Sequence, residues 1–220
     1  SPIQAAIDRA AERGGRVVLP PGTYLSGTVV LKSGVLLDLL PGAVLRGSPR
    51  LEDYQELGRE GHLDLRRWHL IHAEDARDCG IIGQGAIDGN GPEFWEPARA
   101  HEWAFWTARV ERPSPMLQFV NCSGLRIEGV TLRNSPGWTV HTHGCEHVRL
   151  SMITIRNGFF GPNNDGLDID GCRHVMVSDC DIETGDDAIV LKTTFLGGPS
   201  EYVTISNCLL STSCSAFKLG

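Results

Sequence analysis

Apolar residues repeat along the second half of the chain at intervals of 23 to 28 residues. Four segments align by these positions: 121–135, 144–158, 171–185 and 199–213. One column of this alignment contains Leu125, Val148, Val175 and Val203. Within each segment apolar and polar residues alternate, and the alternation changes phase across a short break, as in two brief strands joined by a bend. The repeat therefore predicts a β-solenoid in which each segment contributes one coil.

The first residues of the chain show a helical pattern instead. Ile3, Ala6 and Ile7 fall on one face of a helix predicted over residues 3–13, which the glycines at 14 and 15 end. Because the first coil of a solenoid exposes a sheet edge, we expect this helix to cap it. The strand pattern continues to Gly220 without a second cap, which indicates that further coils follow in a longer protein.

We expect residues 1–220 to form a single all-β domain. Its predicted parts are a capping helix (1–15), N-terminal coils (16–90), an irregular aromatic-rich loop (91–115) and regular coils that carry the chemistry (116–220). An apolar content of 41% is enough for a long core but too low for a membrane span. The net charge of −7 argues against a nucleic-acid partner.

The seven cysteines raise the question of disulfides. In the repeat, however, they form columns: Cys122, Cys145 and Cys172 share one, and Cys180 and Cys208 share another. Free cysteine packs as a small hydrophobe, so we expect these five thiols to be unpaired and buried. No Cys-x-x-Cys pair indicates a zinc site.

Two acidic runs lie one repeat apart, Asn-Asn-Asp-Gly at 163–166 and Gly-Asp-Asp at 185–187. The alignment places Asp165, Asp187 and Ser215 in one column, and strands of adjacent coils are about 4.8 Å apart. Three carboxylates are thus expected in one small area, which proteins avoid unless a ligand or acid/base chemistry requires it.

Three interpretations of this acidic area remain open from the residues alone. The aspartates could cap turns on a polar face, which would suffice for Asp168 and Asp170 on the solvent side of the strand. They could bind calcium, because clustered carboxylates are hard oxygen ligands. They could also form a glycosidase site, in which one carboxyl group protonates the leaving oxygen and another activates water.

The runs "NNDGLDID" (163–170) and "GDDAIVLK" (185–192) resemble glycoside hydrolase family 28, the polygalacturonases. The phrases "GGRVVLPPGTYLSGTVVLKSGVLLDL", "GIIGQGAIDGNG" and "RPSPMLQFVNCSGLRIEGVTLRNSPGWTVH" extend the resemblance over nearly the whole chain. It implies a right-handed parallel β-helix and inverting, metal-free hydrolysis of galacturonosyl linkages in polygalacturonate or rhamnogalacturonan. It also implies an acidic plant polysaccharide or oligogalacturonide as substrate, and a secreted or periplasmic location.

The resemblance also implies roles for individual residues. By position, Asp186 would be the general acid. Asp165 and Asp187 would hold and activate the attacking water, with Asn163 in support. For an inverting enzyme, Asp186 should stand roughly 6.5–9.5 Å from the other two carboxyl groups.

The chain departs from the family pattern at residues 214–216. There it has Cys214-Ser215-Ala216 where the family has Gly-His-Gly. Losing the histidine's positive charge predicts raised pKa values for the neighbouring aspartates, with Lys218 as the nearest group that could compensate.

Other side chains are weaker candidates for substrate binding. Lys192 and Lys218 fall on the solvent face with Asp186 and could bind a uronate carboxylate, and His141 could line the same cleft. Three further histidines are expected on the surface, without metal-binding spacing: His143, His147 and His174.

Two alternatives to the hydrolase are kept. One is a calcium-dependent β-helix polysaccharide lyase, which needs a basic residue beside the calcium carboxylates. The other is a catalytically inactive carbohydrate-binding β-helix, favoured only by the missing Gly-His-Gly motif.

Overall fold

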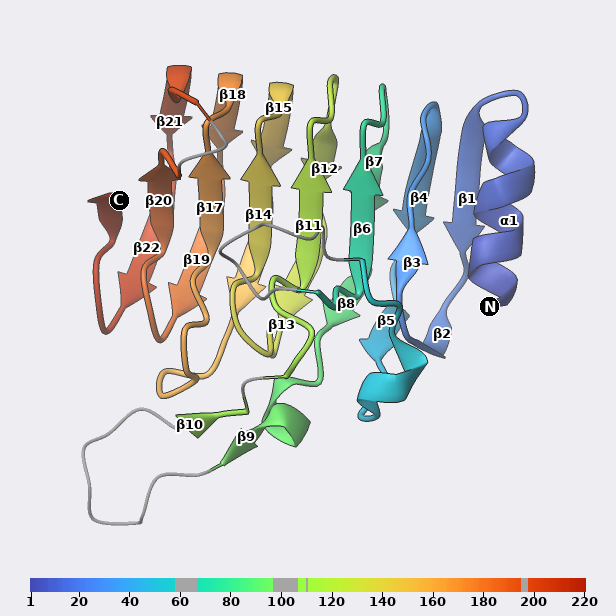
Figure 1. The fold of residues 1–220 in the computed structure, drawn as a ribbon, viewed down its shortest axis with the longest axis horizontal. Coiled ribbons are helices and arrows are strands. Elements are labelled where there is room, and N and C mark those ends of the chain that lie inside the picture. The colour runs from blue at the N-terminus through green and yellow to red at the C-terminus, as the bar shows by residue number, and fades with distance from the viewer. Residues whose placement is uncertain (58–66, 97–106, 110, 195–197) are drawn as a thin grey trace.

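The protein is a parallel β-helix in which three long sheets run along the molecule. The structure, a computed structural model, describes residues 1–57, 67–96, 107–109, 111–194 and 198–220. Each sheet contains seven described strands. Successive strands visit the three sheets in turn, so that every coil adds one strand to each sheet (Figure 1). The fold class predicted from the repeat is confirmed.

Neighbouring strands of each sheet come from successive coils. The first sheet consists of β1 (Gly15–Leu19), β4 (Val35–Leu39), β7 (Gly80–Gly83), β12 (Arg126–Glu128), β15 (Glu146–Ser151), β18 (Arg173–Ser178) and β21 (Glu201–Ser206). The second consists of β2 (Gly22–Ser26), β5 (Ala43–Gly47), β8 (Ala86–Asp88), β13 (Thr131–Arg133), β16 (Thr154–Arg156), β19 (Asp181–Thr184) and β22 (Leu209–Thr212). The third, in front in Figure 1, consists of β3 (Val29–Val30), β6 (Ile71–Glu74), β11 (Leu117–Val120), β14 (Val140–His143), β17 (Leu167–Asp170), β20 (Ile189–Lys192) and β23 (Phe217–Leu219).

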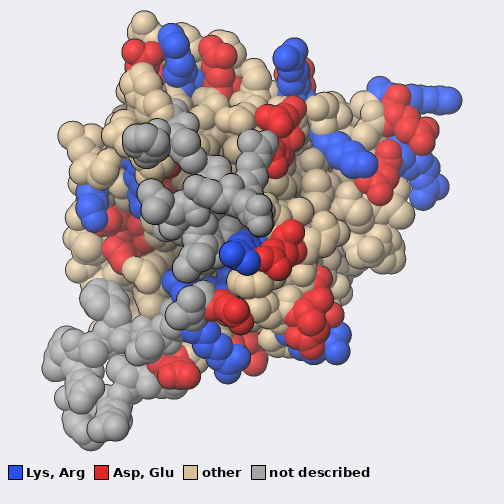
Figure 2. Space-filling view, viewed as in Figure 1, with Lys and Arg blue, Asp and Glu red and all other residues tan. Residues whose placement is uncertain are grey.

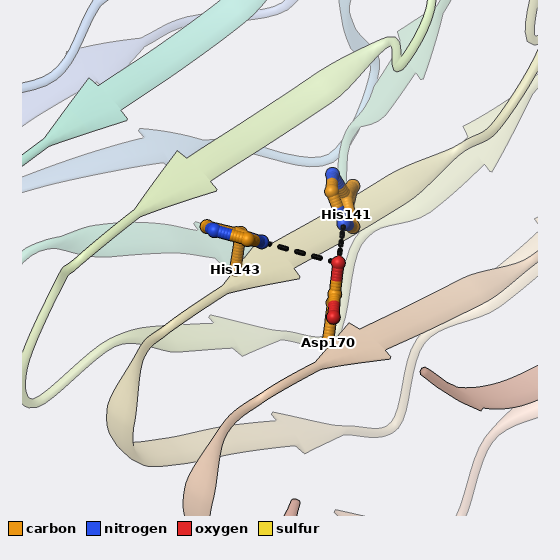
Figure 3. Close-up of side chains that lie close together, drawn as sticks. All are labelled: His141, His143 and Asp170. Carbon is orange, nitrogen blue, oxygen red and sulfur yellow. Dashed lines mark hydrogen bonds and ion pairs between the residues drawn. The ribbon is translucent and has the colours of Figure 1, made fainter. Parts of the chain in front are cut away.

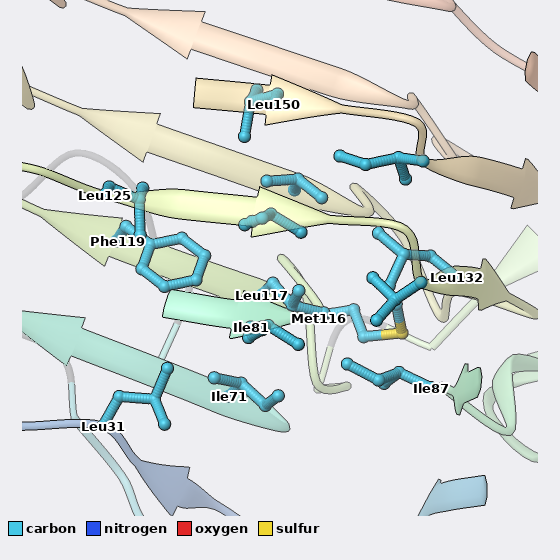
Figure 4. Close-up of a cluster of buried hydrophobic side chains, with 14 of the residues drawn as sticks. Leu31, Ile71, Ile81, Ile87, Met116, Leu117, Phe119, Leu125, Leu132 and Leu150 are labelled. Carbon is cyan, nitrogen blue, oxygen red and sulfur yellow. The ribbon is translucent and has the colours of Figure 1, made fainter. Parts of the chain in front are cut away.

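The columns of the sequence repeat are the register of these sheets. Val148 pairs with Val175, which in turn pairs with Val203. On the third sheet Leu167 pairs with Ile189. Because equal positions of successive coils are neighbours, apolar columns face inward and form a continuous core, part of which is drawn in Figure 4.

The helix α1 (Pro2–Ala11) lies against the first coil, as predicted (Figure 1). Ser1 begins it by accepting a hydrogen bond from the Gln4 N–H at 3.2 Å. The side chain of Gln4 accepts a hydrogen bond from the N–H of Val30 at 2.8 Å and donates one to its carbonyl at 3.0 Å. The helix therefore provides partners for backbone groups at the edge of β3, which is the task of a cap.

All seven cysteines are free, in agreement with the predicted thiol columns. Cys122, Cys145 and Cys172 are buried, and the Sγ of Cys145 lies 3.4 Å from the N–H of Cys122. The expectation of burial is wrong for Cys208, which is only half-buried. It lies between β21 and β22 in the last coil of this chain, where its column has a neighbour on one side only.

The segment between β8 and β11 contains the 3₁₀-helix η2 (Gly91–Phe94) and the antiparallel pair β9 (Trp95–Glu96) and β10 (Thr107–Ala108); a further 3₁₀-helix, η1 (Leu51–Asp53), follows β5. Phe94 and Trp95 are buried, and the indole Nε1 of Trp95 donates to Pro136 O at 3.0 Å. These two aromatic residues hold the segment to the solenoid. The other aromatic residues of the predicted loop lie outside the described residues: Trp103, Phe105 and Trp106. Among the described residues, no helix has the length and apolar character needed to cross a membrane.

Candidate active site

The two acidic runs meet where successive coils enter the third sheet. The N–H of Gly166 donates to Asp187 O at 2.9 Å, and the N–H of Ala188 donates to Ser215 O at 2.8 Å. A Cβ at Gly166 would lie 2.4 Å from Ala188 O, and a Cβ at Gly185 would lie 2.5 Å from Phe159 O. Both positions therefore require glycine, and the stacking predicted for the aspartate column is present.

Asn164, which stands out in the sequence only as part of the run, organises the turn that carries Asp186. Its side chain is fully buried, and its Oδ1 accepts hydrogen bonds from the N–H groups of Gly185 at 2.8 Å and Asp186 at 3.0 Å. Its Nδ2 donates to Gly158 O at 2.7 Å. A buried amide with all these partners fixes the backbone from which Asp186 projects. The sequence signal that could have identified Asn164 was its place within the acidic run.

Asp187 is buried but well supplied with hydrogen-bond donors. Lys218 Nζ lies 2.8 Å from its Oδ2, and the N–H of Ser215 donates to its Oδ1 at 3.2 Å. Burial alone would raise the pKa of Asp187, but the hydrogen bonds from Lys218, Cys214 and Ser215 and the Lys218 charge hold that pKa below its usual range. The expectation that losing the histidine raises this pKa is therefore wrong, because Lys218 supplies the compensating charge.

Asp165 lies in a different electrostatic environment. It is 4% exposed, its Oδ1 has no hydrogen-bond partner among the described residues, and Lys192 Nζ is 3.9 Å from its Oδ2. Burial and the nearby charge of Asp186 raise the pKa of Asp165 to about 6, although Lys192 opposes the rise. A raised pKa is thus found at Asp165, but its largest cause is burial and not the histidine missing at residue 215.

Asp186 is the more accessible carboxylate of the three, being half-buried. Its Oδ1 accepts a hydrogen bond from the N–H of Asp187 at 2.9 Å, which turns the carboxylate back toward its own backbone. Oxygens of Asp186 and Asp187 lie within 4.8 Å of one another and of Cys214 Sγ. The oxygens of Asp186 and Asp187 are therefore closer than the roughly 6.5–9.5 Å expected between the two carboxyl groups of an inverting enzyme. They are close because the two residues are consecutive and joined by this hydrogen bond.

Lys192 lies on the same sheet between an aromatic ring and a carboxylate. Its Nζ is 3.2 Å from the centroid of the Trp138 ring and 3.0 Å from Asp168 Oδ1. Asp168 and Asp170 point to the outer side of β17, as predicted, but both are buried rather than exposed. Side chains and backbone of the next coil, including Lys192 and Thr194, contact them.

The remaining predicted residues lie around this group. Asn163 is exposed, and its Oδ1 is 3.5 Å from Arg112 Nη2. His141 is buried and pairs in register with Asp168. His143 is half-buried with its Nδ1 3.1 Å from Asp170, so its expected surface position is wrong; Asp170 stands opposite it in the neighbouring strand. His147 and His174 are exposed, as expected.

Charged side chains of both signs therefore share one end of the third sheet. Figure 2 shows acidic and basic side chains next to one another at the left of this face. Within the described part of the chain, two groups could offer three metal ligands each: Asp186, Asp187 and Cys214, and His141, His143 and Asp170. In the first group, Lys218 already stands where a cation would neutralise Asp187, and a thiol is a poor ligand for calcium.

Comparisons with known proteins agree with this fold. A family model described as Glycosyl hydrolases family 28 matches residues 58–212, more than half of the chain. A probable polygalacturonase from Vitis vinifera is 29% identical over 192 residues, which cover 83% of this chain. A polygalacturonase from Ralstonia solanacearum is 30% identical over 247 residues and covers 91% of this chain. Among solved structures, the hyperthermoactive exopolygalacturonase from Thermotoga maritima superimposes with a TM-score of 0.83 at 27% identity over 99% of this chain.

The chain is shorter than these proteins. It spans 38% of the Vitis vinifera sequence, 46% of the Ralstonia solanacearum sequence and 58% of the Thermotoga maritima chain.

Proposed function

The chain belongs to glycoside hydrolase family 28, and from this premise we propose that it carries the acid/base site of an enzyme that hydrolyses galacturonosyl linkages in pectin. The substrate class is an acidic plant polysaccharide or an oligogalacturonide. The names of the relatives support this choice, since they are polygalacturonases from a plant and from bacteria.

The observation that carries the proposal is the unequal protonation of stacked carboxyl groups. Near pH 5 the raised pKa of Asp165 keeps one proton in the group, whereas the Lys218 contact keeps Asp187 ionised. Hydrolysis of a glycosidic bond needs one carboxyl group that donates a proton and another that accepts one from water.

We assign the resting proton of the group to Asp165, because burial and then the nearby charge of Asp186 raise the pKa of Asp165. Asp186 delivers the proton to the leaving oxygen because it is the accessible member. To do so, its carboxylate must leave the N–H of Asp187, with which it now forms a hydrogen bond. Such rearrangement on substrate binding is common at acid/base sites.

Water activation falls to Asp187, with Asp165 on the neighbouring coil as the second group that holds the water. Asp187 is ionised and its Oδ2 is fixed by Lys218. Attack from this side, opposite the departing sugar, would invert the anomeric configuration.

Recognition of a uronate falls to the two lysines. The Lys218 side chain is 48% exposed and therefore has ammonium hydrogens available for a carboxylate in addition to Asp187. Lys192 is the second cation near the aspartates, with its Nζ over the Trp138 ring and 3.9 Å from Asp165 Oδ2. Asn163 and His141 remain candidates for further contacts with the polysaccharide.

The lyase alternative has less support. A calcium ion would have to compete with Lys218 for Asp187.

Incubation with de-esterified polygalacturonate, with and without EDTA, tests the proposal. A hydrolase releases new reducing ends that the chelator does not abolish, and NMR of the first products shows the inverted anomer. Absorbance from unsaturated ends that EDTA removes would instead identify a lyase, and binding without cleavage would identify an inactive module. Retention of the anomeric configuration would overturn the roles assigned to Asp187 and Asp165.

A further inference from the structure

Three side chains of the third sheet, distinct from the three aspartates of the candidate active site, converge on one point. His141 and His143 come from β14, and Asp170 comes from the adjacent strand β17 (Figure 3). His141 Nε2 is 3.3 Å from Asp170 Oδ2, and His143 Nδ1 is 3.1 Å from the same oxygen. Two imidazole nitrogens thus point at one carboxylate oxygen.

The tautomer of His141 depends on the contact of the other nitrogen of its ring. Its Nδ1 is 2.9 Å from Gln118 Oε1, in the neighbouring strand β11, and in the tautomer that protonates Nδ1 this nitrogen donates to that oxygen. In the neutral ring, Nε2 then has a lone pair directed at a carboxylate oxygen. Two acceptors face each other at this distance only with a cation between them, either a second proton or a metal ion.

We propose that His141 Nε2, His143 Nδ1 and Asp170 Oδ2 form a binding site for a divalent cation of the zinc type. Two imidazoles and one carboxylate are a ligand set that zinc accepts, and calcium and magnesium prefer oxygen ligands alone. The hydrogen bond from His141 to Gln118 is the kind of contact that orients a metal-binding imidazole and fixes its tautomer.

The spacing of the three atoms fits a small tetrahedral centre. Ligand atoms about 2.0–2.1 Å from a tetrahedral zinc ion are about 3.3–3.4 Å from one another. The two distances from Asp170 Oδ2, 3.1 and 3.3 Å, are close to this value, and the three ligand atoms all lie within 4.8 Å of one another. His143 Nδ1 and Asp170 Oδ2 therefore need only small movements to close on an ion.

Asp170 is prepared for this role by its other contacts. Thr194 N–H donates to Oδ1 at 2.9 Å and its hydroxyl donates to Oδ2 at 2.6 Å, which orients the carboxylate.

The site would tie three coils together. Gln118, the two histidines and Asp170 belong to β11, β14 and β17, which are neighbours in the third sheet. Of its ligands, only His141 is also a candidate for contact with the polysaccharide. The proposed proton transfers use Asp165, Asp186 and Asp187, so metal binding and hydrolysis can fail independently.

Titration with Zn²⁺ by calorimetry tests the site directly, without substrate. A Cys214→Ser background removes the exposed thiol and the second group of possible ligands. We expect one zinc ion per chain. His143→Ala should weaken binding by more than about 100-fold, since it removes a ligand, and Gln118→Leu should weaken it by about 10- to 100-fold, since it removes the orienting hydrogen bond. His147→Ala, an exposed histidine of the first sheet, should have no effect.

A Co²⁺ spectrum provides an independent readout. The bound ion should show tetrahedral visible bands and no sulfur-to-cobalt charge transfer, because the ligands are nitrogen and oxygen. Affinity should fall toward acid pH as the imidazoles take up protons. Circular dichroism will establish that each variant is folded, and His143→Gln replaces His143→Ala if the smaller side chain disrupts the coil. Absence of Zn²⁺ binding by the background protein at millimolar concentration, or binding unchanged in both His143 variants, would overturn the proposal.

Discussion

Replacing Asp165 by asparagine should abolish activity and yet stabilise the folded protein at neutral pH. The carboxyl group is 4% exposed, has a charged neighbour in Asp186 and is not closely paired, since Lys192 Nζ is 3.9 Å from its Oδ2. An amide fills the same space without a charge. The variant therefore removes the unfavourable ionisation and leaves the packing of the coil unchanged.

The magnitude follows from the raised pKa. Burial first, and then the charge of Asp186, raises the pKa of Asp165 from 3.8 to about 6. At 1.36 kcal/mol per pKa unit, the ionised carboxylate costs the folded state about 3 kcal/mol. Between these two values the unfolded chain has lost the proton while the folded chain keeps it. The wild-type free energy of unfolding therefore falls as pH rises from about 4 to about 6.

Urea denaturation of wild type and Asp165→Asn at several pH values between 4 and 7.5 measures this effect. The free energy of unfolding of the variant, minus that of wild type, should grow by up to about 3 kcal/mol over this range and then level off. Exposed Asp179→Asn is the matched control, because Asp179 has a positive φ that asparagine also adopts. A difference for Asp165→Asn that stays constant with pH would refute the reasoning.

Three further substitutions and one titration test the remaining assignments. Asp186→Asn should lower kcat by about 10²- to 10⁴-fold with folding intact, and retention of more than a tenth of wild-type kcat would remove Asp186 from its role. Lys218→Met should raise the pKa of Asp187 and move the acid limb of the kcat/KM profile to higher pH; Lys32→Met, which breaks an exposed ion pair, should not. Asn164→Ala leaves the buried N–H of Gly185 and the partly buried N–H of Asp186 without their acceptor. It should destabilise the fold by about 1–3 kcal/mol, measured by urea denaturation, while lowering kcat more than it changes KM. Thiol titration of unfolded, non-reduced protein should find seven free groups, and a count of five or fewer would show a disulfide.

The stacking of Asp165 on Asp187 was predictable because aligned positions of successive coils are neighbours in one sheet. Alternation with a period of two residues then assigns each side chain to a face. Once the apolar columns are aligned, every outward and inward position of a coil follows. The burial of Asp168 and Asp170 was not predictable in this way. Alternation identifies the face on which a side chain lies, but Asp170 is covered by Thr194, which follows β20 and lies outside the repeat.

Turns also explain the other differences. The importance of Asn164 depends on a turn geometry that brings the Gly185 N–H within 2.8 Å of its Oδ1, and no periodicity describes such a turn. The sequence partly predicts how the missing histidine charge is replaced at Asp187, since it identifies Lys218 as the nearest cation. The 2.8 Å contact between Lys218 Nζ and Asp187 Oδ2 could not be predicted, because the direction of a long, half-exposed side chain does not follow from the sequence.

The register of the solenoid also determines which changes in chain length the aspartate column tolerates. Asp165 and Asp187 are 22 residues apart, and Asp187 and Ser215 are 28 apart, yet all three stack. The longer interval contains the longer connection between β20 and β21, so the column accommodates extra residues there. An insertion of one residue within β18 or β19 would instead reverse the inward and outward faces of the rest of that strand. Natural variation in length should therefore concentrate in the turns after the third sheet and be rare between Gly171 and Thr184.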